Sequence, residues 1–241
     1  MIKIEHIEVF GWEGAIRGMR NPLNSWDKSD SKWKTPCALP GISGYCEECT
    51  YDACHHKGEE QFIIGEADLA LMHKLCRAGS DHRKFLRQIM VSMDITAPRY
   101  WWPEFDAYKV GTVANSCSTM HTIHKKPFEL DDFSCEKLSC IDIGYGIKSP
   151  WQSLKDTIRM LNGCRELYLQ TNDKDYWYMM IQLLPQSYNQ LRTVTLNYEV
   201  LLNMYHARRN HKLSEWRKLC SVIETLPYFA DICLTEEKEK C

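Results

Sequence analysis

The sequence lacks the long apolar runs, one-sided charge and repeats that mark several large classes of protein. No apolar run approaches the roughly 20 residues that cross a bilayer, so no membrane partner is expected. The formal net charge is −2, from 30 basic and 32 acidic residues, so no overall basic field favours a nucleic acid polymer as partner. Internal repeats and low-complexity linkers are also missing. These absences favour an ordinary globular protein.

Cysteine is the residue type that is present in excess. The chain has 12 cysteines in 241 residues, about 5%, which is below the density of a disulfide scaffold. The N-terminal stretch Met1–His6 is charged and alternating, which is not the pattern of a signal peptide. We therefore expect a cytoplasmic location, where cysteines are mostly thiols, metal ligands or core residues.

Four of the cysteines cluster within a stretch that has little periodicity, and two histidines follow them. The cluster consists of Cys37, Cys46, Cys49 and Cys54, followed by His55 and His56. Thiolates and imidazoles at this density suit a tetrahedral structural zinc, which would also order a segment with few apolar residues. An iron–sulfur cluster and free thiols in a loop are the alternatives, because the spacing is not that of a standard zinc finger.

Hydrophobic periodicity divides the chain into an N-terminal part with strands and a C-terminal part with helices. Strands are expected at 2–10 and 89–97, and irregular or loop-rich chain at 21–61 and 110–147. Helices are expected at 14–20, 66–78, 81–88, from Pro98 towards Lys109, and at about 150–170, 174–184, 187–208 and 212–225. Pro103 would kink or delay the helix that follows Pro98. Trp101 and Trp102 within it are read as packing residues.

This pattern predicts an α+β fold, with a small antiparallel sheet and a helical C-terminal half. We expect residues 1–241 to form a single domain that carries a cysteine-rich insert at about 30–60.

The expected helix at 187–208 presents polar residues at a spacing that places them on one face. Thr193 and Asn197 are at one end of this face and Arg208 is at the other, with Leu201 and Met204 between them. Such a face could line a polar pocket. It could equally be a helix end where Arg208 meets solvent and Asn197 bonds to neighbouring backbone.

Several segments together resemble the flavin-dependent thymidylate synthases. Leu184-Pro185, a spacer, Thr195-x-Asn197 and a helix leading to Arg208 resemble the C-terminal signature of that family. His82 with Phe85-Leu86 resembles its flavin-side histidine and apolar pair, and Ala15-x-Arg17-x-x-Arg20 resembles its N-terminal segment. The likeness covers roughly residues 1–20 and 65–225.

The chain departs from the family at the family's nucleotide motif, which begins Arg-His-Arg. The stretch in register with it is Ala107–Thr112, where Lys109 keeps a positive charge and Thr112 keeps a hydroxyl, and Glu104 replaces the preceding glutamine. Lysine lacks the forked geometry with which arginine grips a phosphate. A shift by one residue would bring in Asn115, Ser116 and Ser118. The loop expected at 111–118 is rich in hydroxyl and small side chains, so its backbone N–H groups could hold an anion. It could equally be a plain polar loop.

The resemblance implies a flavin enzyme that methylates a pyrimidine deoxynucleotide at C5. Reduced FAD would supply hydride, methylenetetrahydrofolate the one-carbon unit and NADPH the reducing equivalents, within a homo-oligomer, specifically a tetramer. Arg208 would be catalytic, by stabilising negative charge on the ring. Implied flavin contacts are His82, Asn197, Asn203, Lys109 and Thr112. Implied nucleotide contacts are Arg20, Glu104, Asn115, Ser116, Ser118 and Arg208.

Two other functions are open on the residues alone. A relative that keeps the fold is favoured by the loss of the family's arginines; it would bind a nucleotide or another protein without catalysis, or act on an altered nucleotide substrate. A zinc nucleotide deaminase is suggested by His6-Ile7-Glu8 and Cys46-x-x-Cys49, although Tyr45 stands where that signature has proline.

Overall fold

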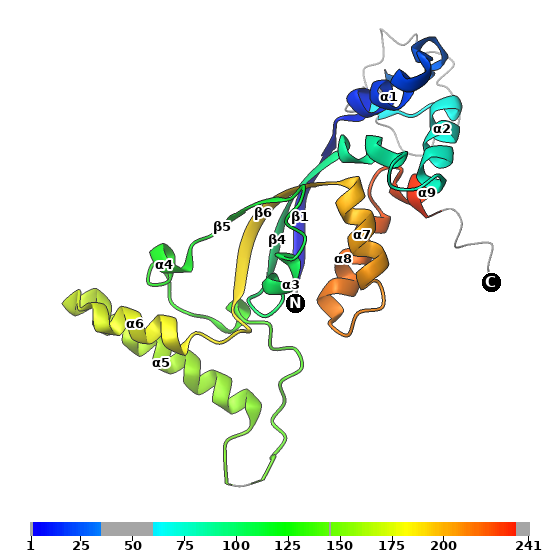
Figure 1. Cartoon of the computed structure of the whole chain (residues 1–241). Coiled ribbons are helices and arrows are strands. Elements are labelled where there is room, and N and C mark those ends of the chain that lie inside the picture. Colours follow the sequence, from blue (N-terminus) through cyan, green and yellow to red (C-terminus); the bar gives the residue numbers. More distant parts are fainter. Residues whose placement is uncertain (1, 35–59, 145, 235–241) are drawn as a thin grey trace, which may run out of the picture. The chain divides into compact units, whose positions relative to one another are not determined.

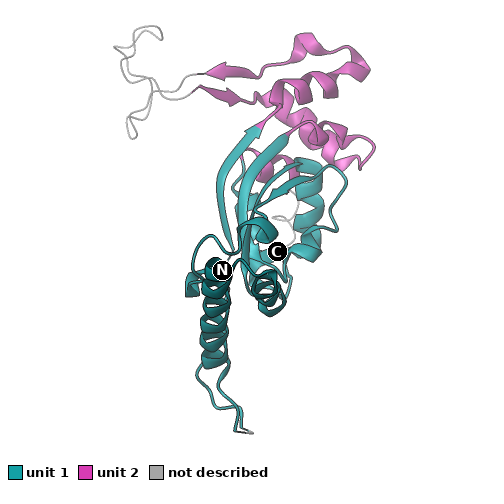
Figure 2. Ribbon diagram, turned by 90° about the vertical axis from the view of Figure 1, so that its left-hand side faces the viewer, with its two compact units in different colours: residues 1–9, 90–226 teal, residues 10–89, 227–241 magenta. Residues whose placement is uncertain are grey.

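The computed structural model describes most of the chain, and the described residues form two compact units. The described ranges are 2–34, 60–144 and 146–234 (Figure 1). Unit 1 comprises Met1–Val9 and Met90–Leu226, and unit 2 comprises Phe10–Ile89 and Pro227–Cys241 (Figure 2). The single domain expected from the sequence stays a prediction.

A four-stranded sheet forms the centre of unit 1. Its strands are β1 (Lys3–Phe10), β4 (Met90–Pro98), β5 (Val113–Ser116) and β6 (Asn189–Asn197). They lie in the order β1-β4-β6-β5, and β6 pairs in the antiparallel sense with both β4 and β5. The predicted strands at 2–10 and 89–97 are therefore confirmed, and so is the α+β class.

The core lies on one face of β4. Val91, Met93, Ile95 and Ala97 alternate along this strand, and each is at most 1% exposed. Alternate side chains of a strand point to the same face, so this pattern fixes the register of β4 against β6. Met90 pairs with Asn197 at one end and Pro98 with Asn189 at the other.

The prediction of one long helix at 187–208 is wrong. Residues Asn189–Asn197 form strand β6, and only Tyr198–Arg208 form helix α7. The β-branched run of Thr193, Val194 and Thr195 suits an extended strand paired on both sides. Asn197 then begins the helix, because its side-chain oxygen accepts the backbone N–H of Val200 at 3.1 Å. Thr193 and Arg208 consequently do not share a helix face.

The helix expected to begin at Pro98 is also placed wrongly. Pro98 is the last residue of β4, and helix α3 is short, Trp102–Phe105. Pro103 lies in its first turn, where a missing N–H costs nothing. Trp101 and Trp102 are 0% and 1% exposed, which confirms that they are packing residues.

The aromatic residues of α3 pack against a helix from the other end of the chain. Helix α8 (Ser214–Glu224) contributes Trp216, whose ring centroid lies 4.7 Å from that of Trp101. Helices α7 and α8 contact each other, and α8 confirms the helix predicted at 212–225. These contacts bring Arg208, at the end of α7, close to α3.

A second core lies beneath a helical hairpin of unit 1. Helices α5 (Pro150–Thr171) and α6 (Lys174–Leu183) run side by side and confirm two predicted helices (Figure 1). Leu161 and Met180 meet there with 0% exposure. The stretch at 110–147, expected to be loop-rich, contains β5, helix α4 (Thr119–Thr122) and the 3-10 turn Leu130–Asp132. Pairing with β6 gives the backbone on one side of β5 its hydrogen-bond partners.

The described part of unit 2 is mostly helical and contains a small β-hairpin. Its helices are α1 (Trp12–Arg20), α2 (Glu66–Arg77) and α9 (Phe229–Cys233), with 3-10 turns at Asn21–Leu23, Trp26–Lys28 and Arg83–Arg87. The helices predicted at 14–20 and 66–78 are confirmed, while the one at 81–88 is a 3-10 turn. Strands β2 (Lys32–Lys34) and β3 (Gln61–Ile63) pair antiparallel, so 21–61 is not wholly irregular.

Among the residues that the structure describes, no helix is long and apolar enough to cross a membrane. The cytoplasmic location stays a prediction.

Candidate active site

Arg208, at the end of α7, is the centre of a polar and aromatic cluster in unit 1. Its Nη1 donates to Glu104 Oε2 at 2.7 Å, and its Nε donates to the Tyr108 hydroxyl at 3.0 Å. The guanidinium carbon lies 4.7 Å from the ring centroid of Trp216. A guanidinium stacked on an aromatic face is oriented as well as attracted. The Arg208 side chain is 20% exposed, and its Nη2 donates to no residue that the structure describes.

Glu104, from α3, holds this cluster together through one of its two oxygens. Oε2 accepts from Arg208 and from the indole N–H of Trp216 at 3.0 Å, and His211 Nε2 lies 3.4 Å away. Oε1 accepts no hydrogen bond from the residues described. The side chain is 37% exposed. A carboxylate here lowers the local positive charge but leaves one acceptor open to a ligand.

The start of α7 is covered by the chain segment that carries Lys109 and Thr112. Gly111 has a φ of +78°, and a Cβ at this position would lie 2.8 Å from Asn197 Nδ2. Only glycine combines this backbone angle with so close an approach. The hydroxyl of Thr112 is buried without a hydrogen-bond partner in the described chain. Lys109 is exposed and forms no ion pair with a described residue.

The expected anion-binding loop is a strand along the edge of the sheet. Asn115 and Ser116 lie on β5, opposite Thr193 and Arg192 of β6, and both are exposed. Only 113–116 of the stretch expected as a loop form this strand, and they pair with β6 on one side. Ser118 caps α4, where its hydroxyl accepts the N–H of His121 at 3.4 Å.

In unit 2, Arg20 forms a buried ion pair with Asp68. Arg20 Nε donates to Asp68 Oδ1 at 2.6 Å, and the two side chains are 4% and 0% exposed. Asp68 Oδ2 also accepts from the hydroxyls of Ser29 and Ser31, at 2.7 and 2.6 Å. Burial alone would raise the pKa of the Asp68 carboxyl, but these hydrogen bonds and Arg20 hold it below its usual 3.8.

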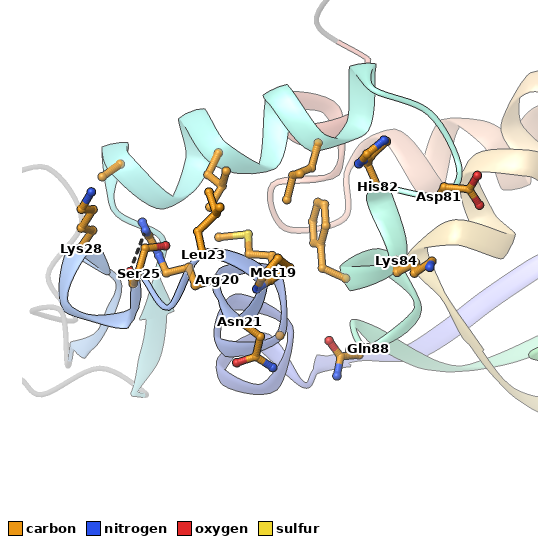
Figure 3. Close-up of a pocket in the computed structure, with 16 residues that line it drawn as sticks. Met19, Arg20, Asn21, Leu23, Ser25, Lys28, Asp81, His82, Lys84 and Gln88 are labelled. Carbon is orange, nitrogen blue, oxygen red and sulfur yellow. Dashed lines mark hydrogen bonds between the residues drawn. The ribbon is translucent and has the colours of Figure 1, made fainter.

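The same unit contains a cavity of about 900 Å³, with His82 at its edge (Figure 3). Apolar side chains that include Leu71, Leu75 and Phe85 form part of its lining. His82 and Lys84 are near one end of the cavity and Lys28 is near the other (Figure 3). A cavity with apolar walls and separated cations can take a flat ring joined to an anionic group.

The residues implied by the family resemblance thus fall into two sets. Unit 1 holds Arg208, Glu104, Asn197, Thr112 and Lys109, and also Asn203, which is exposed on α7, and Asn115, Ser116 and Ser118. Unit 2 holds Arg20 and His82, which both line the 900 Å³ cavity. Cys37, Cys46, Cys49 and Cys54 lie outside the described residues. Within the described ranges, no group of three or more histidine, cysteine, aspartate or glutamate side chains could hold a metal ion.

Sequence reasoning missed the aromatic half of the Arg208 cluster. Tyr108, His211 and Trp216 come from three different segments, and no spacing in the sequence connects them with Arg208. His6, the histidine of the deaminase-like motif, lies on β1, where its Nδ1 is 2.9 Å from Asp94 Oδ2. It is therefore engaged in the sheet of unit 1.

Comparison with known proteins finds likeness in structure only. No family model matches the sequence, and no curated protein matches it. The chain is similar to thymidylate synthase X from Helicobacter pylori, solved with FAD and dUMP, with 17% identity and a TM-score of 0.59 over 100% of this chain and 99% of that one. It is also similar to the UMP/dUMP methylase PolB from Streptomyces cacaoi, bound with 5-Br dUMP. That match has 12% identity and a TM-score of 0.57, over 97% of this chain and 91% of that one.

The chain therefore has the fold of the flavin-dependent thymidylate synthases over its whole length. This confirms the resemblance drawn from its motifs at the level of the fold. Fold alone does not establish the reaction, which depends on the residues of the site.

Proposed function

We propose that this protein catalyses flavin-dependent methylation of a pyrimidine deoxynucleotide at C5. The observation that carries the proposal is the position of Arg208, partly exposed at the end of α7 among Tyr108, Trp216 and Glu104. The fold supports it, because similar structures were solved with FAD and dUMP. When bound, the reduced flavin would supply hydride and methylenetetrahydrofolate would supply the one-carbon unit, with NADPH as reductant.

The 900 Å³ cavity of unit 2 fits the chemical character of FAD. Its apolar side chains suit a flavin ring, and Lys28 and Lys84 would offset the charge of a diphosphate. His82 would hold the flavin ring at its end of the cavity. Arg20 lines the cavity too, but its Nε and Nη1 already donate to Asp68 and to the Ser25 carbonyl. Arg20 would therefore help to shape the cavity, while Asp68 largely cancels its positive charge.

In unit 1, Arg208 would bind the pyrimidine and stabilise the negative charge that develops on the ring as C5 becomes nucleophilic. Tyr108 and Trp216 orient its guanidinium before substrate arrives, so little reorganisation is needed. Glu104 holds the same guanidinium, and its free Oε1 could accept a hydrogen bond from the nucleotide. Glu104 would also repel a phosphate, so the phosphate group must bind away from it.

Phosphate binding would fall to Lys109 and to polar groups on the edge of the sheet. Lys109 is exposed without an ion-pair partner in the described part of the chain, and Asn115, Ser116 and Ser118 present side-chain donors. These groups replace the forked arginines of the family with a point charge and neutral donors. We expect weaker phosphate binding as a result.

We further propose that the protein is a homo-oligomer, specifically a tetramer. The α5–α6 hairpin exposes a set of large apolar side chains, namely Met160, Leu167, Leu169, Tyr178, Met179 and Leu183. Apolar surface of this kind favours association with another chain. Light scattering of the purified protein gives the test, and a monomeric mass would contradict the proposal.

A structural zinc at Cys37, Cys46, Cys49 and Cys54 is a further proposal, which rests on the sequence alone. Metal analysis of protein purified without chelator would test it. A zinc content far below one per chain would remove it.

The decisive experiment for the proposed function has two parts. Retention of visible flavin bands after addition of excess FAD and desalting would support the cofactor site. Methylation of dUMP by the flavin-loaded protein, with NADPH and labelled methylenetetrahydrofolate, would support the reaction. Flavin retention without turnover on any pyrimidine nucleotide would reject catalysis but keep the cofactor site.

A nucleotide-binding relative without catalysis is the second candidate. It is favoured by the engagement of Arg208 with Glu104 and by the loss of the family's arginines. A protein that stays colourless after FAD addition and desalting, yet binds a pyrimidine nucleotide by calorimetry, would favour this reading.

A further inference from the structure

Unit 2 contains a second cavity, of about 490 Å³, which the proposed function does not use. It lies between helix α1, the 3-10 turn Trp26–Lys28 and the β2–β3 hairpin, and it shares only Arg20 with the 900 Å³ cavity. Three aromatic residues line it: Trp26, Trp33 and Phe62. Its volume is within the range of small-molecule sites.

The aromatic side chains of this cavity are unusually open. Trp26 and Trp33 are 50% and 47% exposed, although tryptophan is usually well buried. The indole N–H of Trp26 donates to Asn21 Oδ1 at 2.8 Å, which orients its ring. Trp33 packs edge-on against Phe62, with centroids 5.2 Å apart. Exposed rings held in place around one cavity offer faces on which a flat ligand can stack.

The charges of the cavity favour an anion. Arg17 and Lys32 line it, both are exposed, and neither forms an ion pair with any residue in the described ranges. Arg20 also lines the cavity, but its charge is neutralised by Asp68. Glu13 is the only acidic side chain among the described residues of the lining. Two free cations against one carboxylate leave a net positive charge beside the aromatic rings.

We propose that this cavity binds a heteroaromatic mononucleotide. The base would stack on the rings of Trp26 and Trp33, and the phosphate would lie between Arg17 and Lys32. Stacking on aromatic side chains tolerates different bases because every base has a π-face. The site does not depend on the proposed catalytic function, since none of these residues belongs to the Arg208 cluster.

Calorimetric titration with AMP tests the proposal, with adenosine and inorganic phosphate as part-ligands. AMP is expected to bind more tightly than either part-ligand, because only AMP uses both the rings and the cations. Trp33→Ala and the double variant Arg17→Ala/Lys32→Ala should each weaken AMP binding about tenfold or more. Trp33→Phe keeps a ring and should retain most of the affinity.

Matched controls separate this cavity from the other sites. Lys34→Ala removes an exposed charge from the same strand outside the cavity, and Lys28→Ala removes one from the 900 Å³ cavity. Both should leave AMP affinity within about threefold, as expected for a single exposed charge. Thermal unfolding would verify that each variant folds. The proposal is overturned if AMP does not bind, if inorganic phosphate binds equally well, or if the Trp33 and Arg17/Lys32 variants bind like the wild type.

Discussion

Arg20 and Arg208 are both paired with a carboxylate, yet their surroundings give them different roles. Arg20 is 4% exposed, and its partner Asp68 is fully buried and accepts further bonds from serine hydroxyls. Arg208 is 20% exposed, its partner Glu104 is 37% exposed, and aromatic rings orient it. The Arg20–Asp68 pair is buried within unit 2. In the Arg208–Glu104 pair, Arg208 Nη2 and Glu104 Oε1 have no hydrogen-bond partner among the described residues.

The difference shows how burial separates a structural arginine from one that is free to bind. Breaking a buried pair leaves a charge that water cannot reach, so the cost falls on folding. Breaking an exposed pair costs little stability, because water replaces the partner. Arg208 can therefore exchange Glu104 for a ligand, and Arg20 cannot exchange Asp68 without loss of structure.

The largest effect is expected for Asp68→Ala, which leaves Arg20 buried and unpaired. We expect it to lower the free energy of unfolding by about 3–5 kcal/mol, as other broken buried pairs do. Chemical denaturation provides the measurement. Asp81→Ala removes an exposed carboxylate of the same unit and should change stability by less than about 0.5 kcal/mol. Equal effects of the two variants would contradict the structural role of the pair.

Arg208→Ala should act on turnover rather than on folding. Loss of a charge-stabilising donor lowers the turnover rate by about 10²–10³-fold, and the melting temperature should change little. Arg209→Ala is the matched control, because Arg209 lies over the ring of Tyr205 instead of beside Glu104. Activity retained in Arg208→Ala, or lost equally in Arg209→Ala, would reject the catalytic role of Arg208.

The buried Arg20–Asp68 pair should also make the stability of unit 2 depend on pH in the acid range. The pKa of Asp68 in the folded protein is below its usual 3.8. As the pH falls, Asp68 is therefore protonated in the unfolded chain before it is protonated in the folded protein. Its contribution to stability is present above about pH 4 and is lost as the pH falls through the lower, folded pKa. Unfolding measured from pH 6 to pH 2 should show this loss in the wild type. Asp68→Asn should show a shallower slope, and an identical slope would contradict the assignment.

The smallest effect is expected for Glu104→Gln, which opens the Arg208 pair. Removal of the charge should tighten binding of the proposed substrate dUMP by up to about fivefold, because an exposed pair is worth at most about 1 kcal/mol. Calorimetry at low and high salt gives the measurement, and the gain should shrink as salt rises. Weaker binding would instead mean that a hydrogen bond from the nucleotide to Glu104 outweighs the repulsion between this carboxylate and the phosphate.

The sequence predicted elements well where one local pattern was strong. The alternation in Ile89–Ala97 and the helical stripe of Glu66–Ala78 correspond to β4 and α2. The pattern at 187–208 wrongly predicts a single helix, because β6 and α7 follow each other without a break and Asn197 is the cap of α7. A strand that is paired on both sides owes its existence to β4 and β5, which are distant in the chain.

Sequence and tertiary structure also make separate contributions to the candidate site. The motif from Leu184 to Arg208 identified Arg208 as a residue of interest, because the residue types and their order lie within one segment. Its neighbours Glu104 and Trp216 come from α3 and α8, so only packing decides that they meet.

By itself, the sequence determined the α+β class, most helices and the family whose fold the chain shares, since periodicity and short motifs are local properties. The tertiary structure alone decided that Arg20 is buried in an ion pair with Asp68, whereas Arg208 is partly exposed and can meet a ligand. Exposure depends on which distant segments cover a side chain, and no spacing along the chain encodes that.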